Sequence, residues 1–251
     1  MNTPIVDFHS HGSLPEPFDI VVENYVRIMD AAGVDISVMN TLGLSPNAVR
    51  GNNLTARFMA RYPDRFVGMA NVTAQYVDEA IPELERAFDT LSMKALKIYP
   101  DVGPINNEAY FPIYEWCNDR EIAVMSHTQY FSGSGNTDSA PRLFASLAER
   151  FPRVSWVLGH SGNSPPGQAQ AIEVAQNYPN IYLETCSSFG DQGTIERLVG
   201  GAGEDKVLYG SDMPLMDSRL HVGRIVTAEI SEEAKRKVLG LNAIKLLRLA
   251  I

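Results

Sequence analysis

Cysteine, basic residues and long apolar runs are all scarce in this sequence. Only two cysteines, Cys117 and Cys186, occur among its 251 residues, which excludes a disulfide framework and a Cys-x-x-Cys metal motif. The apolar runs fall short of the roughly 20 residues that span a bilayer. The first residues, Met-Asn-Thr-Pro, lack the basic and apolar regions of a signal peptide. We therefore expect a cytoplasmic protein with no membrane partner.

The deficit of basic residues argues against binding to nucleic acid. Lysine and arginine total 21 against 30 aspartates and glutamates, which gives a formal charge of −9. Nucleic acids and anionic membranes attract a net basic face instead. A small-molecule substrate, even an acidic one, is compatible with this charge because a few local cations suffice to bind it.

The sequence does contain a regular alternation of short apolar runs and helical patterns. The apolar runs recur about every 25 to 35 residues, as in the βα units of a parallel sheet. Eight such units in series predict one (β/α)8 TIM barrel over residues 1–251, with a doubly wound open sheet as the alternative. The predicted strands are 5–11, 36–42, 66–72, 95–99, 122–128, 154–160, 181–186 and 207–211, and the predicted helices are 18–32, 46–62, 74–91, 108–120, 141–151, 165–178, 193–200 and 231–250.

The first predicted strand ends in a His-x-His motif. Side chains alternate faces along a strand, so His9 and His11 are expected to point the same way, with Asp7 behind them. Two imidazoles at one strand end can share a metal ion, but the motif alone is weak evidence. Further ligands must come from other strand ends.

Other ionisable side chains also fall at predicted strand ends, which meet at one mouth of a barrel. These side chains are Lys97, His127, His160, Glu184 and Asp212. Three imidazoles and one carboxylate form a donor set typical of a catalytic Zn²⁺ site. The predicted metal ligands are His9, His11, His127 and Asp212.

Several strand-end residues are candidates for proton transfer and substrate binding. Asp212 can also transfer a proton, and His160 is expected to act as a general acid or base because its ordinary pKa lies near 6.5. Lys97 has three interpretations: a carboxylated bridge between two ions, a cation for a substrate carboxylate, or the partner of an interior acid. We assign Lys97 and Tyr99 to substrate binding and expect no organic cofactor.

Several further residues have mainly structural interpretations. Glu184 is expected to face a helix or to pair with Lys97, and Asp7 to orient a ligand imidazole. His221 lies outside the pattern of strand ends and is expected at the surface or in a loop. Both cysteines are expected to be buried as small apolar residues.

These motifs resemble the amidohydrolase superfamily, specifically the amidohydrolase-related branch that includes aminocarboxymuconate-semialdehyde decarboxylase-like enzymes. The resemblance implies a (β/α)8 barrel and a divalent metal, usually zinc and in some members manganese, on the four ligands named above. It also implies that His160 contacts the substrate or assists an activated water. Members of this family are often dimers, which makes a homodimer the partner to test for. In chain order it rests on Asp-Phe-His9-Ser-His11, Leu-Lys97-Ile-Tyr-Pro, Val-Met-Ser-His127-Thr, Val-Leu-Gly-His160-Ser-Gly and Tyr-Gly-Ser-Asp212-Met-Pro.

Two activities are compatible with this site. We favour metal-dependent hydrolysis, in which a metal-activated water attacks an amide, ester or lactone carbonyl of a small molecule. The alternative is non-oxidative decarboxylation of a small carboxylic acid, with Lys97, Arg50 or Arg142 binding a carboxylate. A barrel that keeps its metal only as a binding or regulatory module is a third interpretation, which the complete ligand set disfavours.

Overall fold

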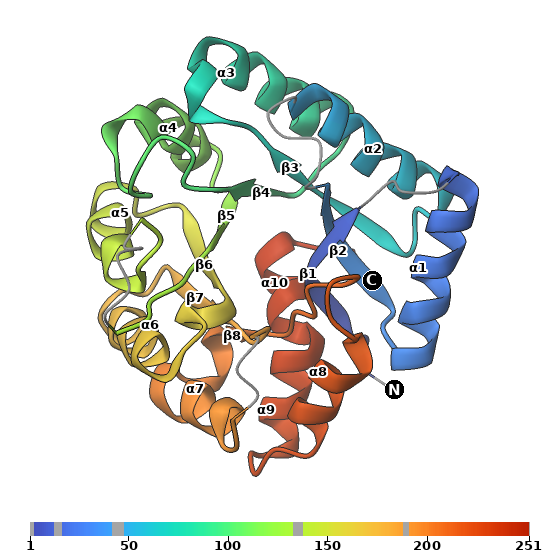
Figure 1. The fold of residues 1–251 in the computed structure, drawn as a ribbon, viewed down its shortest axis with the longest axis vertical. Coiled ribbons are helices and arrows are strands. Elements are labelled where there is room, and N and C mark those ends of the chain that lie inside the picture. Colours follow the sequence, from blue (N-terminus) through green and yellow to red (C-terminus); the bar gives the residue numbers. More distant parts are fainter. Residues whose placement is uncertain (1–2, 13–16, 42–47, 133–137, 188–190, 251) are drawn as a thin grey trace.

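The computed structural model describes residues 3–12, 17–41, 48–132, 138–187 and 191–250. Within them, eight strands follow one another in chain order around a barrel, and each pairs in parallel with the next (Figure 1). This arrangement confirms the predicted TIM barrel over the open doubly wound sheet. The strands are β1 Val6–Gly12, β2 Ile36–Thr41, β3 Phe66–Asn71, β4 Ala95–Ile98, β5 Ala123–His127, β6 Ser155–Gly159, β7 Ile181–Glu184 and β8 Val207–Leu208.

The barrel is closed by the segment that follows β8. The backbone N–H of Phe8 donates to the carbonyl of Tyr209 (2.8 Å), and the N–H of His11 donates to the carbonyl of Met213 (2.7 Å). Between these two bonds, the N–H of Asp212 donates to the carbonyl of His9 (2.7 Å). The hydrogen bonds that complete the barrel therefore also place Asp212 beside the His-x-His motif.

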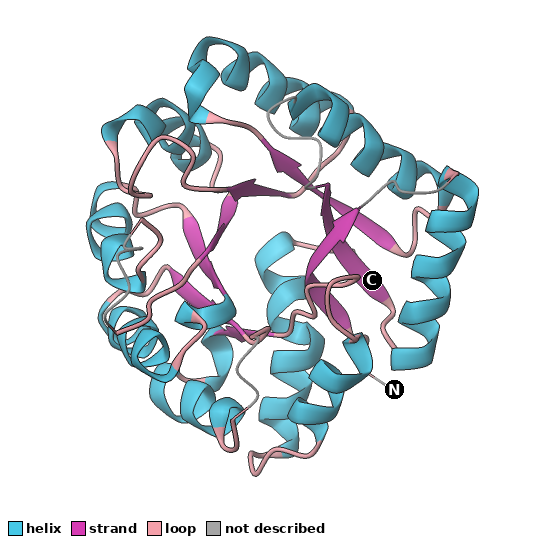
Figure 2. Cartoon of the chain, in the orientation of Figure 1, coloured by secondary structure: helices cyan, strands magenta, loops and turns pink. Residues whose placement is uncertain are grey.

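Helices cover the outside of the barrel (Figure 2). Their ends show common capping interactions. Helix α1 ends at Gly33, whose backbone adopts the left-handed conformation, and the side chain of Ser231 accepts a hydrogen bond from the N–H of Ala234 at the start of α9. The helices are α1 Phe18–Ala32, α2 Ala48–Arg61, α3 Val77–Glu85, α4 Phe111–Asp119, α5 Phe144–Arg150, α6 Pro165–Asn177, α7 Thr194–Ala202, α8 Ser218–Val226, α9 Glu232–Arg236 and α10 Asn242–Leu247, with π-helical turns at Arg86–Thr90 and Lys237–Leu241.

Apolar side chains pack in two layers. A large cluster that includes Phe58, Tyr114 and Trp156 lies between the strands and the outer helices. A smaller cluster fills the barrel interior, where strand residues such as Met125 meet Leu247 of α10. Figure 1 shows α10 within the outline of the ring of strands. The amino-terminal end of the barrel is thus closed by apolar packing, and the polar residues gather at the carboxyl ends of the strands.

A bulge in β1 decides which of its side chains enter the barrel. Pairing with β2 joins Asp7 to Ser37 but Ser10 to Met39, so β1 has one more residue than β2 between these points. Val6, before the bulge, and Phe8, within it, belong to the interior cluster. The extra residue shifts the alternation, and His9 and His11 then point into the mouth. Bulges next to functional sites commonly re-aim side chains in this way.

The observed elements depart from the predicted ones near the C-terminus. β8 is shorter than predicted because residues 209–213 turn to pair with β1. No helix was predicted for α8, and the predicted helix 231–250 is divided into α9, a π-helical turn and α10. Predicted element positions 42 and 46–47 lie outside the described residues. In the part of the chain that the structure describes, none of the helices has the length and apolar character to cross a membrane.

Candidate metal centre

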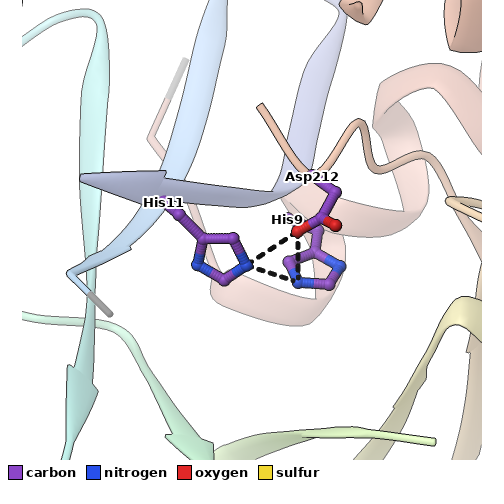
Figure 3. Close-up of side chains that lie close together, drawn as sticks. All are labelled: His9, His11 and Asp212. Atoms are coloured by element: carbon purple, nitrogen blue, oxygen red, sulfur yellow. Dashed lines mark hydrogen bonds and ion pairs between the residues drawn. The ribbon is translucent and has the colours of Figure 1, made fainter. Parts of the chain in front are cut away.

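His9, His11 and Asp212 form a tight cluster at the mouth of the barrel (Figure 3). Oδ1 of Asp212 lies 2.8 Å from Nε2 of His11 and 3.5 Å from Nε2 of His9. The two Nε2 atoms are 3.1 Å apart. All three residues are buried. The structure thus brings together three of the four residues predicted to hold a metal.

Glu184 determines which nitrogen of His9 faces this cluster. Its Oε2 atom is 2.8 Å from Nδ1 of His9, and the backbone N–H groups of His160 and Cys186 donate to the same carboxylate. Because these neighbours are donors, the carboxylate acts as an acceptor and the His9 proton resides on Nδ1. Nε2 therefore presents a lone pair to the cluster, as a metal ligand must.

Burial keeps the clustered imidazoles neutral. Burial, reinforced by Lys97, holds the pKa of His9 well below its ordinary value, and burial also lowers the pKa of His11 and of His127. Burial raises the pKa of Asp212, but the hydrogen bond with His11 and the electrostatic contributions of His11, His160 and Lys97 outweigh it, so this pKa lies below its ordinary value. Neutral imidazoles and an ionised carboxylate are the protonation states that bind a cation.

His127, the fourth predicted ligand, lies beside His160 and outside the tight cluster. Its ring centroid is 4.6 Å from that of His160, and it stacks on Tyr99 at 6.2 Å. Its Nε2 atom lies 3.3 Å from Oε1 of Gln129. Among the described residues, His127 is not in any group of three potential ligands whose donor atoms all lie within 4.8 Å of one another. With Tyr99, it forms an aromatic wall next to the cluster.

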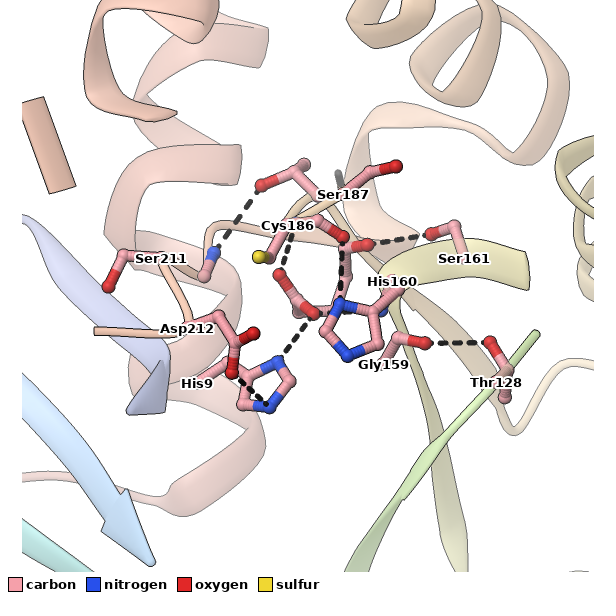
Figure 4. Close-up of polar contacts among 12 residues, drawn as sticks. His9, Thr128, Gly159, His160, Ser161, Cys186, Ser187, Ser211 and Asp212 are labelled. Atoms are coloured by element: carbon pink, nitrogen blue, oxygen red, sulfur yellow. Dashed lines mark hydrogen bonds and ion pairs between the residues drawn. The ribbon is translucent and has the colours of Figure 1, made fainter. Parts of the chain in front are cut away.

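His160 begins a left-handed turn directly after β6. His160, Ser161 and Asn163 have φ of 66°, 46° and 62°, a conformation that costs about 1 to 3 kcal/mol per non-glycine residue and persists where surrounding contacts hold it. Nδ1 of His160 lies 3.2 Å from the carbonyl of Cys186 and therefore carries the proton (Figure 4). Nε2 is left as an acceptor, and burial lowers the pKa of His160 to about 3.

Lys97 is fully buried on β4 and points at the same cluster. Its Nζ atom lies 2.9 Å from Nε2 of His9 and 5.3 Å from the centre of the Tyr99 ring. Burial lowers the pKa of Lys97 to about 8, and the charges of Glu184 and Asp212 oppose that change. Burial also raises the pKa of Glu184, against the N–H donors and Lys97. The acidic neighbours favour the protonated Lys97, and the N–H donors favour the ionised Glu184. Lys97 therefore places a cation inside the mouth of the barrel.

Asp7 does not orient an imidazole, contrary to the prediction. Its carboxylate accepts the backbone N–H groups of His9 (3.1 Å) and Ser211 (2.9 Å) as well as the Ser211 hydroxyl. The bulge explains the error. Val6 and Phe8 on either side of Asp7 belong to the interior cluster, so Asp7 points to the other strand face, and the extra residue of the bulge separates it from the face of His9. Asp7 therefore holds the backbone next to Asp212, and Glu184 takes the role that was predicted for Asp7.

His221 is buried, which makes the predicted surface or loop position wrong. It lies on α8 with 1% of its surface exposed, and its Nε2 atom is 3.4 Å from Sδ of Met216 and 4.0 Å from Sγ of Cys186. Arg224 donates to its Nδ1 atom (3.4 Å). Because α8 was not predicted, nothing in the pattern placed His221 against the barrel. Cys117 and Cys186 are both buried, as predicted.

The donor set fits a divalent cation. With the His9 proton on Nδ1, the Nε2 lone pair of His9 and the Asp212 carboxylate are two acceptors 3.5 Å apart. Nζ of Lys97 lies 2.9 Å from the same Nε2 atom, so a cation is already attracted to this pair. Imidazole and carboxylate are ligands of Zn²⁺ and of other first-row divalent ions. Fold and site together define a TIM-barrel protein with a divalent-metal centre at the carboxyl ends of its strands.

Comparison with protein families assigns the chain to one such class. The family model described as Amidohydrolase matches residues 6–249, which is almost the whole barrel. The chain therefore belongs to the amidohydrolase family, in the branch that is similar to aminocarboxymuconate-semialdehyde decarboxylase.

Two curated relatives align with most of the chain. The 2-amino-3-carboxymuconate-6-semialdehyde decarboxylase of Dictyostelium discoideum is 26% identical over 237 residues, which cover 79% of this chain and 65% of the relative. The gamma-resorcylate decarboxylase of a Polaromonas species is 22% identical over 292 residues, with 91% and 88% covered. The chain thus spans about two thirds of the length of the first relative and most of the second.

Solved structures share the same fold. The 5-carboxyvanillate decarboxylase of Sphingomonas paucimobilis has a TM-score of 0.80 at 18% identity, covering 99% of this chain and 100% of the other. A dihydroxybenzoic acid decarboxylase from a Polaromonas species, solved with bound manganese and 2-nitroresorcinol, has a TM-score of 0.78 at 18% identity, covering 99% and 98%. At this identity the likeness shows the fold alone. The family supports a divalent metal as cofactor, and the bound manganese is a property of the neighbour.

The comparisons overturn hydrolysis as the expected main activity. The relatives and the structural neighbours named above are decarboxylases. The two curated relatives support an enzyme, and they favour the decarboxylation that was the alternative interpretation of the site. Hydrolysis was favoured because of a ligand set that hydrolases and decarboxylases share, and such a set cannot distinguish the two activities.

Proposed function

We propose that the protein is a metal-dependent, non-oxidative decarboxylase of a small carboxylic acid. The observation that carries the proposal is the buried Lys97 ammonium group, which lies 2.9 Å from Nε2 of His9 within the metal-binding cluster. A cation there can bind a substrate carboxylate beside the metal. The decarboxylase names of the curated relatives support this choice.

In this proposal His9, His11 and Asp212 hold the metal, and His127 completes the set. The donors suit Zn²⁺, and the manganese of a structural neighbour makes Mn²⁺ the other candidate. When bound, the metal supplies a positive charge that polarises oxygen atoms of the substrate. Tyr99, stacked on His127, offers an aromatic surface for the body of a small-molecule substrate.

The protein side chains then have separate tasks in the reaction. Decarboxylation breaks the bond between a substrate carbon and its carboxylate, the electron pair stays on that carbon, and CO₂ departs. The carbon then needs a proton, and we assign Asp212 as its carrier: the carboxylate, ionised in the resting site, takes the proton from solvent and delivers it to the carbon. We also assign general acid–base catalysis to His160, whose Nε2 atom is an acceptor. Because burial lowers the pKa of His160 to about 3, a proton that it takes from a substrate hydroxyl group is readily returned.

Lys97 is the predicted cation that contacts the cluster. Of the other two candidates, Arg142 lies over the ring of Tyr130 at 5.8 Å, and Arg50 lines a separate groove with Glu79. The proposal therefore assigns carboxylate binding to Lys97 and sets aside the carboxylated bridge and the purely structural pair.

Release of CO₂ tests the proposed activity directly. Protein loaded with Zn²⁺ or Mn²⁺ should release CO₂ from at least one member of a panel of hydroxylated aromatic carboxylates and carboxymuconate-type acids, as detected by a coupled carbonate assay. Chelator-treated protein should release none, and added metal should restore the rate. Release of acid from an ester and lactone panel, with no CO₂ from the carboxylates, would contradict the proposal.

Replacing Lys97 by methionine should separate carboxylate binding by Lys97 from a carboxylated bridge between two ions. Loss of a buried charge that pairs with a substrate charge costs about 2 to 5 kcal/mol, so we expect CO₂ release to fall at least about 30-fold. Metal content, measured by mass spectrometry, should be unchanged, because the substitution also removes the group that competes for Nε2 of His9. A parallel loss of metal would instead indicate a carboxylated lysine that bridges ions.

A further inference from the structure

We propose that Glu184 is a positioning residue that couples the predicted metal ligand His9 to the predicted acid–base residue His160. The inference rests on the proposed function, since both partners take their roles from it. It assigns to one interior carboxylate the orientation of the metal site and of the proton-transfer group together.

One carboxylate reaches both partners. Glu184 is fully buried at the end of β7. Its Oε2 atom accepts Nδ1–H of His9 at 2.8 Å and the backbone N–H of His160 at 2.9 Å. Its Oε1 atom accepts the backbone N–H of Cys186, whose carbonyl in turn accepts Nδ1–H of His160. Figure 4 shows His9, His160 and Cys186 in this region, with their contacts as dashed lines.

The surroundings leave the carboxylate little freedom. A Cβ atom added to Gly210 would lie 2.3 Å from Oε1 of Glu184 and 2.7 Å from Cβ of His9, so glycine at this position makes the room that both side chains need. On the other side, the hydroxyl of Ser161 donates to the backbone carbonyl of Glu184 at 2.8 Å. Glu184 is thus held from both sides, by the segment after β8 and by the left-handed turn.

Two consequences follow from this geometry. The bond to Nδ1 keeps the His9 proton away from the cluster, and the negative charge makes Nε2 a stronger ligand. The bond to the His160 backbone holds the first residue of a strained turn, so the imidazole of His160 keeps a fixed direction. A residue that merely filled space between the strands would influence neither metal affinity nor the His9 tautomer.

The first test compares two buried glutamates. Glu184→Gln keeps the shape but leaves one oxygen for three N–H donors, so we expect the dissociation constant for Zn²⁺, measured by chelator competition, to rise about 10- to 100-fold. Glu83→Gln is the matched control, because Glu83 is also buried but accepts from Asn52 and Arg86 on the outer layer. That variant should bind Zn²⁺ as the unchanged protein does. Equal affinity in a folded Glu184→Gln protein would overturn the proposal.

A second test needs no substitution. In metal-free protein labelled with ¹⁵N-histidine, the long-range ¹H–¹⁵N spectrum should show His9 with its proton on Nδ1, protected from exchange. A His9 proton on Nε2 would overturn the proposal even if Glu184→Gln failed to fold. The proposed function fails separately, if the unchanged protein binds no metal or releases no CO₂. If Glu184→Gln binds metal and releases CO₂ as the unchanged protein does, the positioning role of Glu184 is rejected and the proposed function stands.

Discussion

Replacing His11 by alanine is expected to remove the divalent metal and, with it, decarboxylation. Nε2 of His11 lies 2.8 Å from Oδ1 of Asp212 and 3.1 Å from Nε2 of His9, so the substitution deletes a central donor. Loss of an outer partner of a ligand already costs about 10- to 100-fold in metal affinity, and loss of the ligand itself should cost more than about 100-fold. Metal content by mass spectrometry and CO₂ release measure the two effects.

A second buried histidine supplies the control for this variant. His221 is as deeply buried as His11 but lies on α8, against Met216 and Cys186. His221→Ala should cost stability through lost packing and yet retain its metal. Full metal content in His11→Ala, or equal loss in both variants, would show that the tight cluster is not where the metal binds.

Replacing His160 by asparagine should separate chemistry from metal binding. General acid–base catalysis contributes about 100- to 10,000-fold, so we expect the turnover rate to fall by at least about 100-fold while the metal is retained. Asparagine is suitable because it tolerates the left-handed backbone at φ 66°, where alanine would add strain. Turnover and metal content of the same preparation give the comparison.

The same variant also shows whether His160 is a metal ligand or an acid–base residue beside the metal. His160, His9 and Glu184 have donor atoms close enough together to surround an ion. Metal loss in His160→Asn as severe as in His11→Ala would make His160 a direct ligand. Full turnover in the folded His160→Asn variant would show that His160 has no acid–base role in the reaction.

Much of this architecture was predictable because it depends on periodic signals. The sequence contains eight apolar runs separated by helical patterns. An error at one end of a predicted strand or helix does not change the number of βα units. The position of His9, His11 and Asp212 at strand ends followed from the same count, since parallel strands in a closed barrel bring their carboxyl ends to one mouth. Prediction was weakest after β8, where residues 209–213 leave the regular ladder and α8 carries His221 into the interior.

The sequence alone was sufficient for the barrel and the family, because these follow from residue type and from spacing along the chain. Orientation required the tertiary structure. A bulge within β1 turned Asp7 away from the cluster, and Glu184, from a strand far along the chain, took its expected place beside His9. His127 came to lie against His160, outside the tight cluster. Such outcomes depend on the register between strands and on contacts across the barrel, and no local pattern in the chain records them.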